Sequence, residues 1–187
     1  MKVTSMSKFF VEIGAADFDT LLPLAKMGWS GYVVEPIPEM ASKLEEMFDG
    51  YPVEIINAAV SDYNGSLEMV IARDDGSWLR GCSHVVSNNH LGFRLNEVLD
   101  RQGDFEQRIT VPCFTLTRLL KDVQSVDFMK VDAEGHELNI FMNYDFRVKP
   151  RMIKIEHKHV SDEILRRKLE TNGYLVWTEK DDIYGVS

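Results

Sequence analysis

Short apolar runs alternate with amphipathic segments in the first third of the chain. Residues 8–13, 31–35 and 53–56 are largely apolar, and the first two runs end at Gly14 and Pro36. Such runs are typical of parallel strands buried on both faces. The two segments between these runs, at 18–25 and 37–44, repeat their apolar residues at helical spacing. The order strand, helix, strand, helix, strand predicts a parallel sheet with right-handed crossovers.

This rhythm is interrupted in the middle of the chain. Residues 65–71 predict an additional strand, and 73–92, rich in Gly, Ser, Asn and Asp, predict a long loop. Residues 91–99 predict a short helix. Residues 109–112 predict an edge strand, because Pro112 cannot donate a hydrogen bond to a neighbouring strand.

Alternation resumes in the last third. Residues 126–132 and 152–156 predict strands, and helices are expected to begin near Glu134 and to include residues 164–169. Residues 174–177 and 183–186 predict a terminal hairpin. We therefore predict one α/β domain over residues 1–187, with a loop-rich insertion at about 65–112.

The first helix of the chain is expected to start near residues 19–20, which leaves Pro23 in its first turn.

Composition narrows the possible partners and compartment. The 187 residues carry a net charge of −9, which argues against nucleic acid because phosphate contacts need a basic surface. No apolar run approaches the length of a membrane span, and the N-terminus lacks a secretory signal. Two cysteines, Cys82 and Cys113, are too few for a disulfide framework or a zinc cage. We therefore expect a cytoplasmic protein.

The turn after the first strand resembles a nucleotide-binding turn. Gly14, Ala15 and Ala16 allow a ligand to approach the backbone closely, and a helix N-terminus follows. However, the GxGxxG pattern that cradles a pyrophosphate is missing. A cofactor without phosphates fits better. Glu12 and Asp17 are expected to face the positive ammonium and sulfonium of S-adenosylmethionine.

A second candidate contact lies at the end of the second strand. Glu35 follows Gly14 by about 20 residues, where a carboxylate accepts hydrogen bonds from a ribose diol. The turn after the third strand, 57–62, is expected to lie over the adenine, with Asn57 or Asp62 near its exocyclic amine. An ordinary polar turn explains Asp62 equally well.

The densest group of polar residues spans 130–137. Strand alternation places Lys130 and Asp132 on one face, and His136 follows across a turn. His157, after the next strand, is the first candidate for the general base and His136 the second, with Asp132 orienting the base or the cofactor. Asp132, Glu156 and His157 also offer an oxygen-rich site for Mg²⁺, although their spacing matches no metal signature.

Four segments of the chain resemble the FkbM-type family of S-adenosylmethionine-dependent methyltransferases: FVEIGAADFDT, YVVEPIP, NAAVSDYNGSLEM and VDFMKVDAEGHELNIF. The resemblance implies a class I methyltransferase (Rossmann-like) fold, a three-layer sandwich whose mostly parallel seven-stranded sheet has an antiparallel terminal strand. It also implies O-methylation of a hydroxyl on a sugar or small natural product. Ala16 departs from the family, which often has Asn there.

By similarity, Glu12, Gly14, Glu35, Ser61 and Asp132 border the cofactor. Together with the turn residues, the predicted cofactor site comprises Glu12, Gly14, Ala15, Ala16, Asp17, Glu35, Pro36, Ala59, Ser61 and Asp132.

Two other functions agree with the same residues. Glu35 also suits an NAD-dependent dehydrogenase, which the missing glycines oppose, and a non-catalytic cofactor-binding module would keep the same fold. The acceptor is expected to be a small molecule or a glycan hydroxyl. Trp78, His84 and Phe93 are candidates to line its pocket. Its cover is expected to come from residues 73–105 or from a second subunit of a homo-oligomer.

Overall fold

The computed structural model describes residues 8–17, 20–72, 83–86 and 105–187. Seven strands form the main sheet: β1 (Phe9–Ile13), β2 (Ser30–Val34), β3 (Val53–Ile56), β8 (Phe128–Val131), β9 (Met152–Glu156), β10 (Leu175–Glu179) and β11 (Asp182–Val186). Their order across the sheet is β10-β11-β9-β8-β1-β2-β3. β11 runs antiparallel to both of its neighbours, and the other pairs are parallel. This topology confirms the predicted class I methyltransferase fold.

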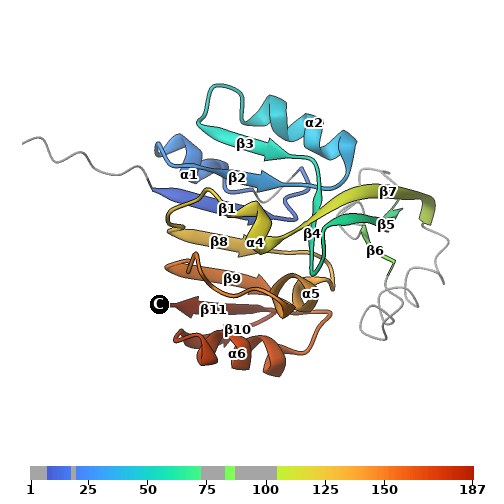
Figure 1. Ribbon diagram of the computed structural model, residues 1–187. Helices are drawn as coiled ribbons and strands as arrows, with labels where there is room; N and C mark the ends of the chain where they lie inside the picture. Colours follow the sequence, from blue (N-terminus) through green and yellow to red (C-terminus); the bar gives the residue numbers. More distant parts are fainter. Residues whose placement is uncertain (1–7, 18–19, 73–82, 87–104) are drawn as a thin grey trace, which may run out of the picture.

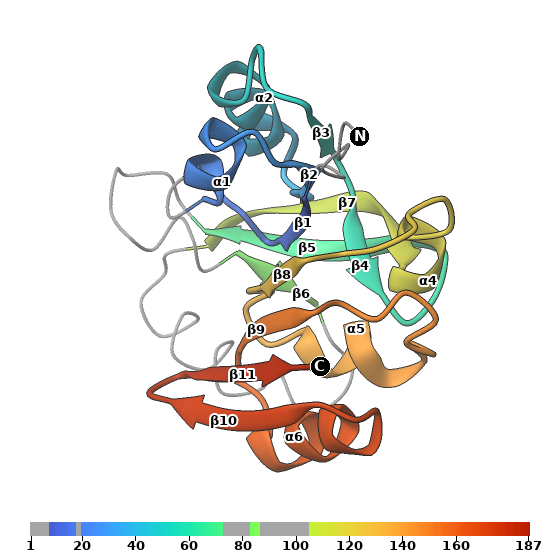
Figure 2. The same cartoon turned by 90° about the vertical axis from the view of Figure 1, so that its left-hand side faces the viewer.

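Helices cover the two faces of this sheet (Figures 1 and 2). α1 (Leu22–Lys26) and α2 (Pro38–Met47) follow β1 and β2, whereas α4 (Leu116–Leu119), α5 (Glu137–Met142) and α6 (Asp162–Thr171) lie on the opposite side. Successive strand residues point to opposite faces. Phe10 accordingly packs with the α1–α2 layer, and Val11 packs with the layer that contains α5 and α6. The three-layer arrangement therefore follows from strands that are apolar at consecutive positions.

Two helices begin later than the sequence predicts. α1 starts at Leu22, with Pro23 in its first turn as expected. α5 starts at Glu137 rather than near Glu134, because Glu134 and Gly135 have φ values of 47° and 97°, which no right-handed helix accepts. The delay leaves residues 132–135 as a turn at the end of β8, where their polar groups remain outside the helix.

A second sheet lies beyond the carboxyl ends of the parallel strands (Figure 1). It contains β4 (Ala59–Ser61), β5 (Gly65–Ala72), β6 (His84–Val85) and β7 (Phe105–Thr115), in the order β4-β7-β5-β6. The predicted edge strand at 109–112 is part of the longer strand β7, and in the described residues these four pair on one side only, with β5. Pro112 is tolerated there because β4 pairs with β7 only from Cys113 to Thr115.

Several predictions fall outside the residues that the structure describes. These are the helix at 91–99, nearly all of the loop at 73–92, Cys82, and the proposed acceptor contacts Trp78 and Phe93. Within the described residues, Cys113 is a buried free thiol. Among these residues, no helix has the length and apolarity needed to cross a membrane.

Candidate functional site

The carboxyl ends of β1, β2 and β8 are drawn together around Gly14. The Gly14 amide donates to Val34 O at 3.0 Å, and the Asp132 amide donates to Ile13 O at 2.9 Å. A Cβ atom on Gly14 would lie 1.7 Å from the Asp132 carbonyl oxygen, and its φ is 76°. Only glycine fits this crossing. The motif glycine therefore sets the distance between two strand ends.

A cavity opens at these strand ends, and both sheets contribute to its walls. Its apolar side includes Ile13, Val34, Ile37, Met40, Val60, Met69 and Val85. Its polar side includes Glu35, Ser83, Lys130, Asp132, Glu134 and His136. Apolar walls with a few convergent polar groups are typical of cofactor sites, and this position is where open parallel sheets bind ligands.

The cavity contains most of the predicted cofactor residues. Gly14, Ala15, Ala16, Glu35, Pro36, Ala59 and Asp132 line it, whereas Glu12, Asp17 and Ser61 do not belong to its described lining. Lys130, Ile37 and Met40 also line the cavity, and no sequence motif marked them as site residues. The position of Met40, on the first turn of the helix after Glu35, was the available signal.

Glu35 is buried at the centre of this arrangement. Its Oε2 accepts from the Ala16 amide and its Oε1 from the Ile37 amide, both at 2.9 Å. Burial raises the pKa of Glu35 to about 7, although both backbone hydrogen bonds lower it. The two amides fix the carboxyl group in one orientation, and each oxygen can still accept a second hydrogen bond from a ligand.

The backbone of Ala16 supports this orientation. Ala16 has φ 49°, in the left-handed region that Asn tolerates better than Ala. The common Asn of the resembled family is therefore explained by backbone conformation, and the Ala16 amide still reaches Glu35.

The carboxylates of Glu12 and Asp17 bind other groups of the protein and do not line the described cavity. Glu12 is fully buried; its Oε2 accepts from the Leu21 amide at 2.8 Å, and its Oε1 pairs with Lys130 Nζ at 3.3 Å. Asp17 pairs with Lys43 Nζ at 3.5 Å. The predicted contact of these two carboxylates with the cofactor's positive charge has no support in this geometry.

The turn after β3 is held by its own side chains. Asn57 Nδ2 donates to the carbonyl oxygens of Glu35 and Pro36, so it braces the Glu35 turn. Ser61 Oγ donates to Asp62 Oδ1 at 3.1 Å and lies 3.0 Å from His136 Nε2. Because the only hydroxyl hydrogen of Ser61 goes to Asp62, Nε2 of His136 is the donor to Ser61.

His136 is consequently a neutral imidazole. It is buried, and desolvation lowers its pKa to about 4 against the opposing effect of the Asp62 charge. His136 lines the cavity. However, its Nε2 is committed to Ser61 as a donor, so this nitrogen is not available as a proton acceptor.

Asp132 lies among several other carboxyl groups. Burial and the Glu134 charge raise its pKa, whereas Lys130 and a side-chain hydrogen bond from Glu156 lower it. Burial, and then the charges of Asp132, Glu134 and Glu137, raise the pKa of Glu156 to about 8. Burial and mutual repulsion therefore favour one shared proton in the hydrogen bond between the Asp132 and Glu156 carboxyl groups.

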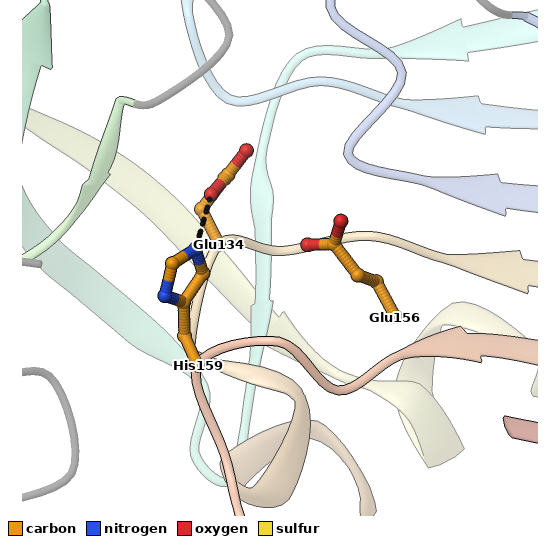
Figure 3. Close-up of side chains that lie close together, drawn as sticks. All are labelled: Glu134, Glu156 and His159. Atoms are coloured by element: carbon orange, nitrogen blue, oxygen red, sulfur yellow. Dashed lines mark ion pairs between the residues drawn. The ribbon is translucent and has the colours of Figure 1, made fainter. Parts of the chain in front are cut away.

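His157 does not join this group. Its Nε2 lies 3.3 Å from Lys180 O, in the turn between β10 and β11, and His157 is not among the described residues of the cavity lining. The predicted metal trio of Asp132, Glu156 and His157 does not converge. Figure 3 shows instead His159 turned toward Glu134, with Nε2 3.4 Å from Glu134 Oε2, and Glu156 nearby.

Ligand atoms of Glu134, Glu156 and His159 lie within 4.8 Å of one another. They are the group that fits a cation by distance. His84, a predicted acceptor contact, is buried in β6; its neighbours Ser83 and Val85 line the cavity, so strand alternation turns His84 to the other face.

Comparison with known proteins gives one family. The family model of the methyltransferase FkbM domain matches residues 12–176. Among curated proteins, none matches the chain significantly.

Three solved structures with a related chain path are distant in sequence. The ribosomal protein L11 methylase from Lactobacillus delbrueckii subsp. bulgaricus has a TM-score of 0.48 and 11% identity; the match covers 98% of this chain and 70% of that one. The T. thermophilus 16S rRNA N2 G1207 methyltransferase, in complex with AdoMet and guanosine, has a TM-score of 0.48 and 9% identity. There the match covers 96% of this chain and 37% of the other.

A third is a SAM-dependent methyltransferase from Agrobacterium tumefaciens, with a TM-score of 0.46 and 8% identity. The match covers 98% of this chain and 56% of that one. The chain thus spans less than two thirds of the length of the second and third structures.

Proposed function

Since the chain belongs to the methyltransferase FkbM family, we propose that it transfers a methyl group from S-adenosylmethionine to a hydroxyl oxygen of a sugar or another small natural product. The observation that carries the proposal is Glu35, a buried carboxyl group fixed by two amides in the wall of a strand-end cavity. This carboxyl group is suited to a ribose diol.

The other walls of the cavity suit the rest of the cofactor. Ile37, Met40 and Val60 offer an apolar surface to an adenine ring. Asp132 and Glu134 supply negative charge, which favours the sulfonium and ammonium groups. When bound, S-adenosylmethionine supplies an electrophilic methyl group. The chain contributes by holding acceptor and cofactor in line, which accounts for a large share of the acceleration in such reactions.

The acceptor hydroxyl also needs a proton acceptor. Neither histidine predicted as the base suits this task, because His136 has a low pKa and His157 lies against the β10–β11 turn. Asp132, which was predicted to orient the base or the cofactor, lines the cavity with a carboxyl group. We therefore assign proton removal to Asp132, with Glu156 as its hydrogen-bonding partner. General-base catalysis contributes about 10²–10⁴-fold.

Single-turnover methyl transfer tests this assignment. Asp132→Asn should lose about 10²-fold or more in rate, whereas His157→Ala should stay near the wild-type rate. A slow His157→Ala variant, together with a fast Asp132→Asn variant, would return the base to the histidine.

Titration with the two candidate cofactors tests the function itself. The protein should bind S-adenosylmethionine and not NAD, and Glu35→Ala should weaken that binding. NAD binding with no response to S-adenosylmethionine would favour the dehydrogenase. Tight S-adenosylmethionine binding with no S-adenosylhomocysteine formed from any hydroxyl acceptor would favour the non-catalytic module.

The Mg²⁺ prediction and the homo-oligomer prediction are separate parts of this proposal. Proton removal by Asp132 needs no metal, so methyl transfer should persist after treatment with EDTA. If Mg²⁺ restores a rate that EDTA removes, the cation has a role, and variants of Glu134 and His159 would locate it. The mass of the protein in solution tests the second subunit.

A further inference from the structure

Lys130 is a buried cation in the wall of the cavity. It is 5% exposed, lies on β8, and pairs through Nζ with Glu12 Oε1 at 3.3 Å. Among the described lining residues, it is the only lysine or arginine. A buried ammonium group is costly unless carboxylates surround it. Among the described residues, Lys130 is therefore the cationic side chain that a negative group of a ligand in this cavity could meet.

Glu12 holds this ammonium group in place. The two carboxylate oxygens of Glu12 have different partners, since Oε1 meets Lys130 and Oε2 accepts from the Leu21 amide at 2.8 Å. Leu21 precedes the first residue of α1. Glu12 thus joins β8 to the start of α1 from within β1, and it fixes Nζ of Lys130 relative to the Gly14 turn.

The charge of the cavity limits what Lys130 can recognise. Glu35, Asp132 and Glu134 line the same space and repel a ligand carboxylate, whereas they attract the ammonium and sulfonium groups. A cationic partner offsets this repulsion for the carboxylate of a zwitterionic amino-acid group. Lysine provides it as a compact point charge with three N–H donors, which interacts with more than one carboxylate at once.

We infer that Lys130 binds the α-carboxylate of the methionine part of the cofactor, and that Glu12 is the positioning residue that holds Lys130 there. This inference rests on the proposed function, because it names a subsite for the proposed cofactor. The competing explanation is an ion pair that only joins β1 to β8. The two explanations predict different affinities of a Lys130 variant for ligands that lack the carboxylate.

Three ligands separate these explanations by calorimetric titration. S-adenosylhomocysteine has both ammonium and carboxylate, its decarboxylated form keeps only the ammonium, and 5′-methylthioadenosine has neither. In wild type, S-adenosylhomocysteine should bind best. Lys130→Met should weaken S-adenosylhomocysteine about 30-fold or more, change 5′-methylthioadenosine less than about threefold, and leave the decarboxylated form as tight or tighter than in wild type.

Lys154 provides a matched control. It is the register partner of Lys130 on β9 and pairs with Asp182 at 3.1 Å, but it is not among the described residues of the cavity lining. Lys154→Met should leave the affinities for all three ligands near their wild-type values. Because Lys130→Met removes the ion-pair partner of the buried Glu12 carboxylate, the double variant Glu12→Gln/Lys130→Met keeps the test valid if the single variant does not fold.

Kinetics then test the positioning role of Glu12. Glu12→Gln keeps an acceptor for Leu21 but removes the ion pair, so KM for S-adenosylmethionine should rise about tenfold with kcat nearly unchanged. Equal losses for all three ligands in Lys130→Met, or an unchanged affinity for S-adenosylhomocysteine, would overturn the inference. If wild type binds none of the three ligands, the proposed function fails instead.

Discussion

Replacing Gly14 with alanine should disrupt both the fold and the cavity at the strand ends. The added Cβ would lie 1.7 Å from the Asp132 carbonyl oxygen, and close carbon–oxygen contacts are about 3.3 Å. The strand ends would therefore have to separate by about 1.6 Å. That movement is expected to break both the bond from the Asp132 amide to Ile13 O and the bond from the Gly14 amide to Val34 O.

The loss of unfolding free energy in Gly14→Ala can be compared with the loss for the same substitution at another glycine with positive φ. Two broken backbone hydrogen bonds in a buried site cost about 2–6 kcal/mol, and the left-handed conformation adds about 1–2 kcal/mol. Gly28 has φ 85° with no atom within 4 Å of its would-be Cβ. Gly28→Ala should therefore cost only about 1–2 kcal/mol. Gly14→Ala should exceed this by at least about 2 kcal/mol.

Urea denaturation of the two variants measures this difference, provided that the slope of the transition is unchanged. Total stabilities of about 5–15 kcal/mol leave Gly14→Ala marginal or unfolded, while Gly28→Ala stays folded. Equal free energies of unfolding for the two variants would refute the argument from close approach. They would leave backbone conformation as the only role of Gly14.

Three further changes test other parts of the site. Ala16→Asn should raise the free energy of unfolding by about 0.5–1 kcal/mol, because asparagine accepts the left-handed conformation better; a lower value in urea denaturation contradicts this. The pKa of Glu35 is raised to about 7 from 4.5, so the folded state holds this proton more tightly than the unfolded chain. Its contribution to stability is complete below pH 4.5 and declines by up to about 3 kcal/mol as pH rises through 7. Glu35→Gln should flatten the fall of the unfolding free energy over this range, and an unchanged slope contradicts it. Ser61→Ala should lower the free energy of unfolding by about 1–3 kcal/mol, since it leaves the buried His136 Nε2–H without its acceptor. A melting temperature equal to that of wild type would show that this bond does not stabilise the fold.

The parallel strands could be predicted because their sequences are apolar at consecutive positions. Phe10 and Val11 both need burial, and only a strand between two helical layers buries both. The second sheet was harder to predict. Pro112 indicated a residue that pairs on one side only, but the pairing of β7 with β4 beyond it depends on residues distant in sequence.

The site was predictable in position but not in the direction of its side chains. The sequence placed Glu12 and Glu35 at strand ends, and Glu35 does line the cavity. Glu12 turns to Lys130 instead, a residue 118 positions away. That contact exists because β1 and β8 are neighbours in the sheet, and sequence spacing does not show strand order. The delayed start of α5 likewise depends on two positive φ values at residues 134 and 135.

The cavity has walls from both sheets, and this has a thermodynamic consequence. Ile13 and Val34 end strands of the main sheet, while Met69 and Val85 belong to the second sheet. A ligand held between them links the two sheets, and at 100 times its Kd it stabilises the folded state by about 2.7 kcal/mol. Amide hydrogens along β5 and β6 should therefore exchange more slowly when the cavity is filled, although these strands carry neither Glu35 nor Asp132. The stability of the second sheet and the occupancy of the cavity would then be linked through one folding equilibrium.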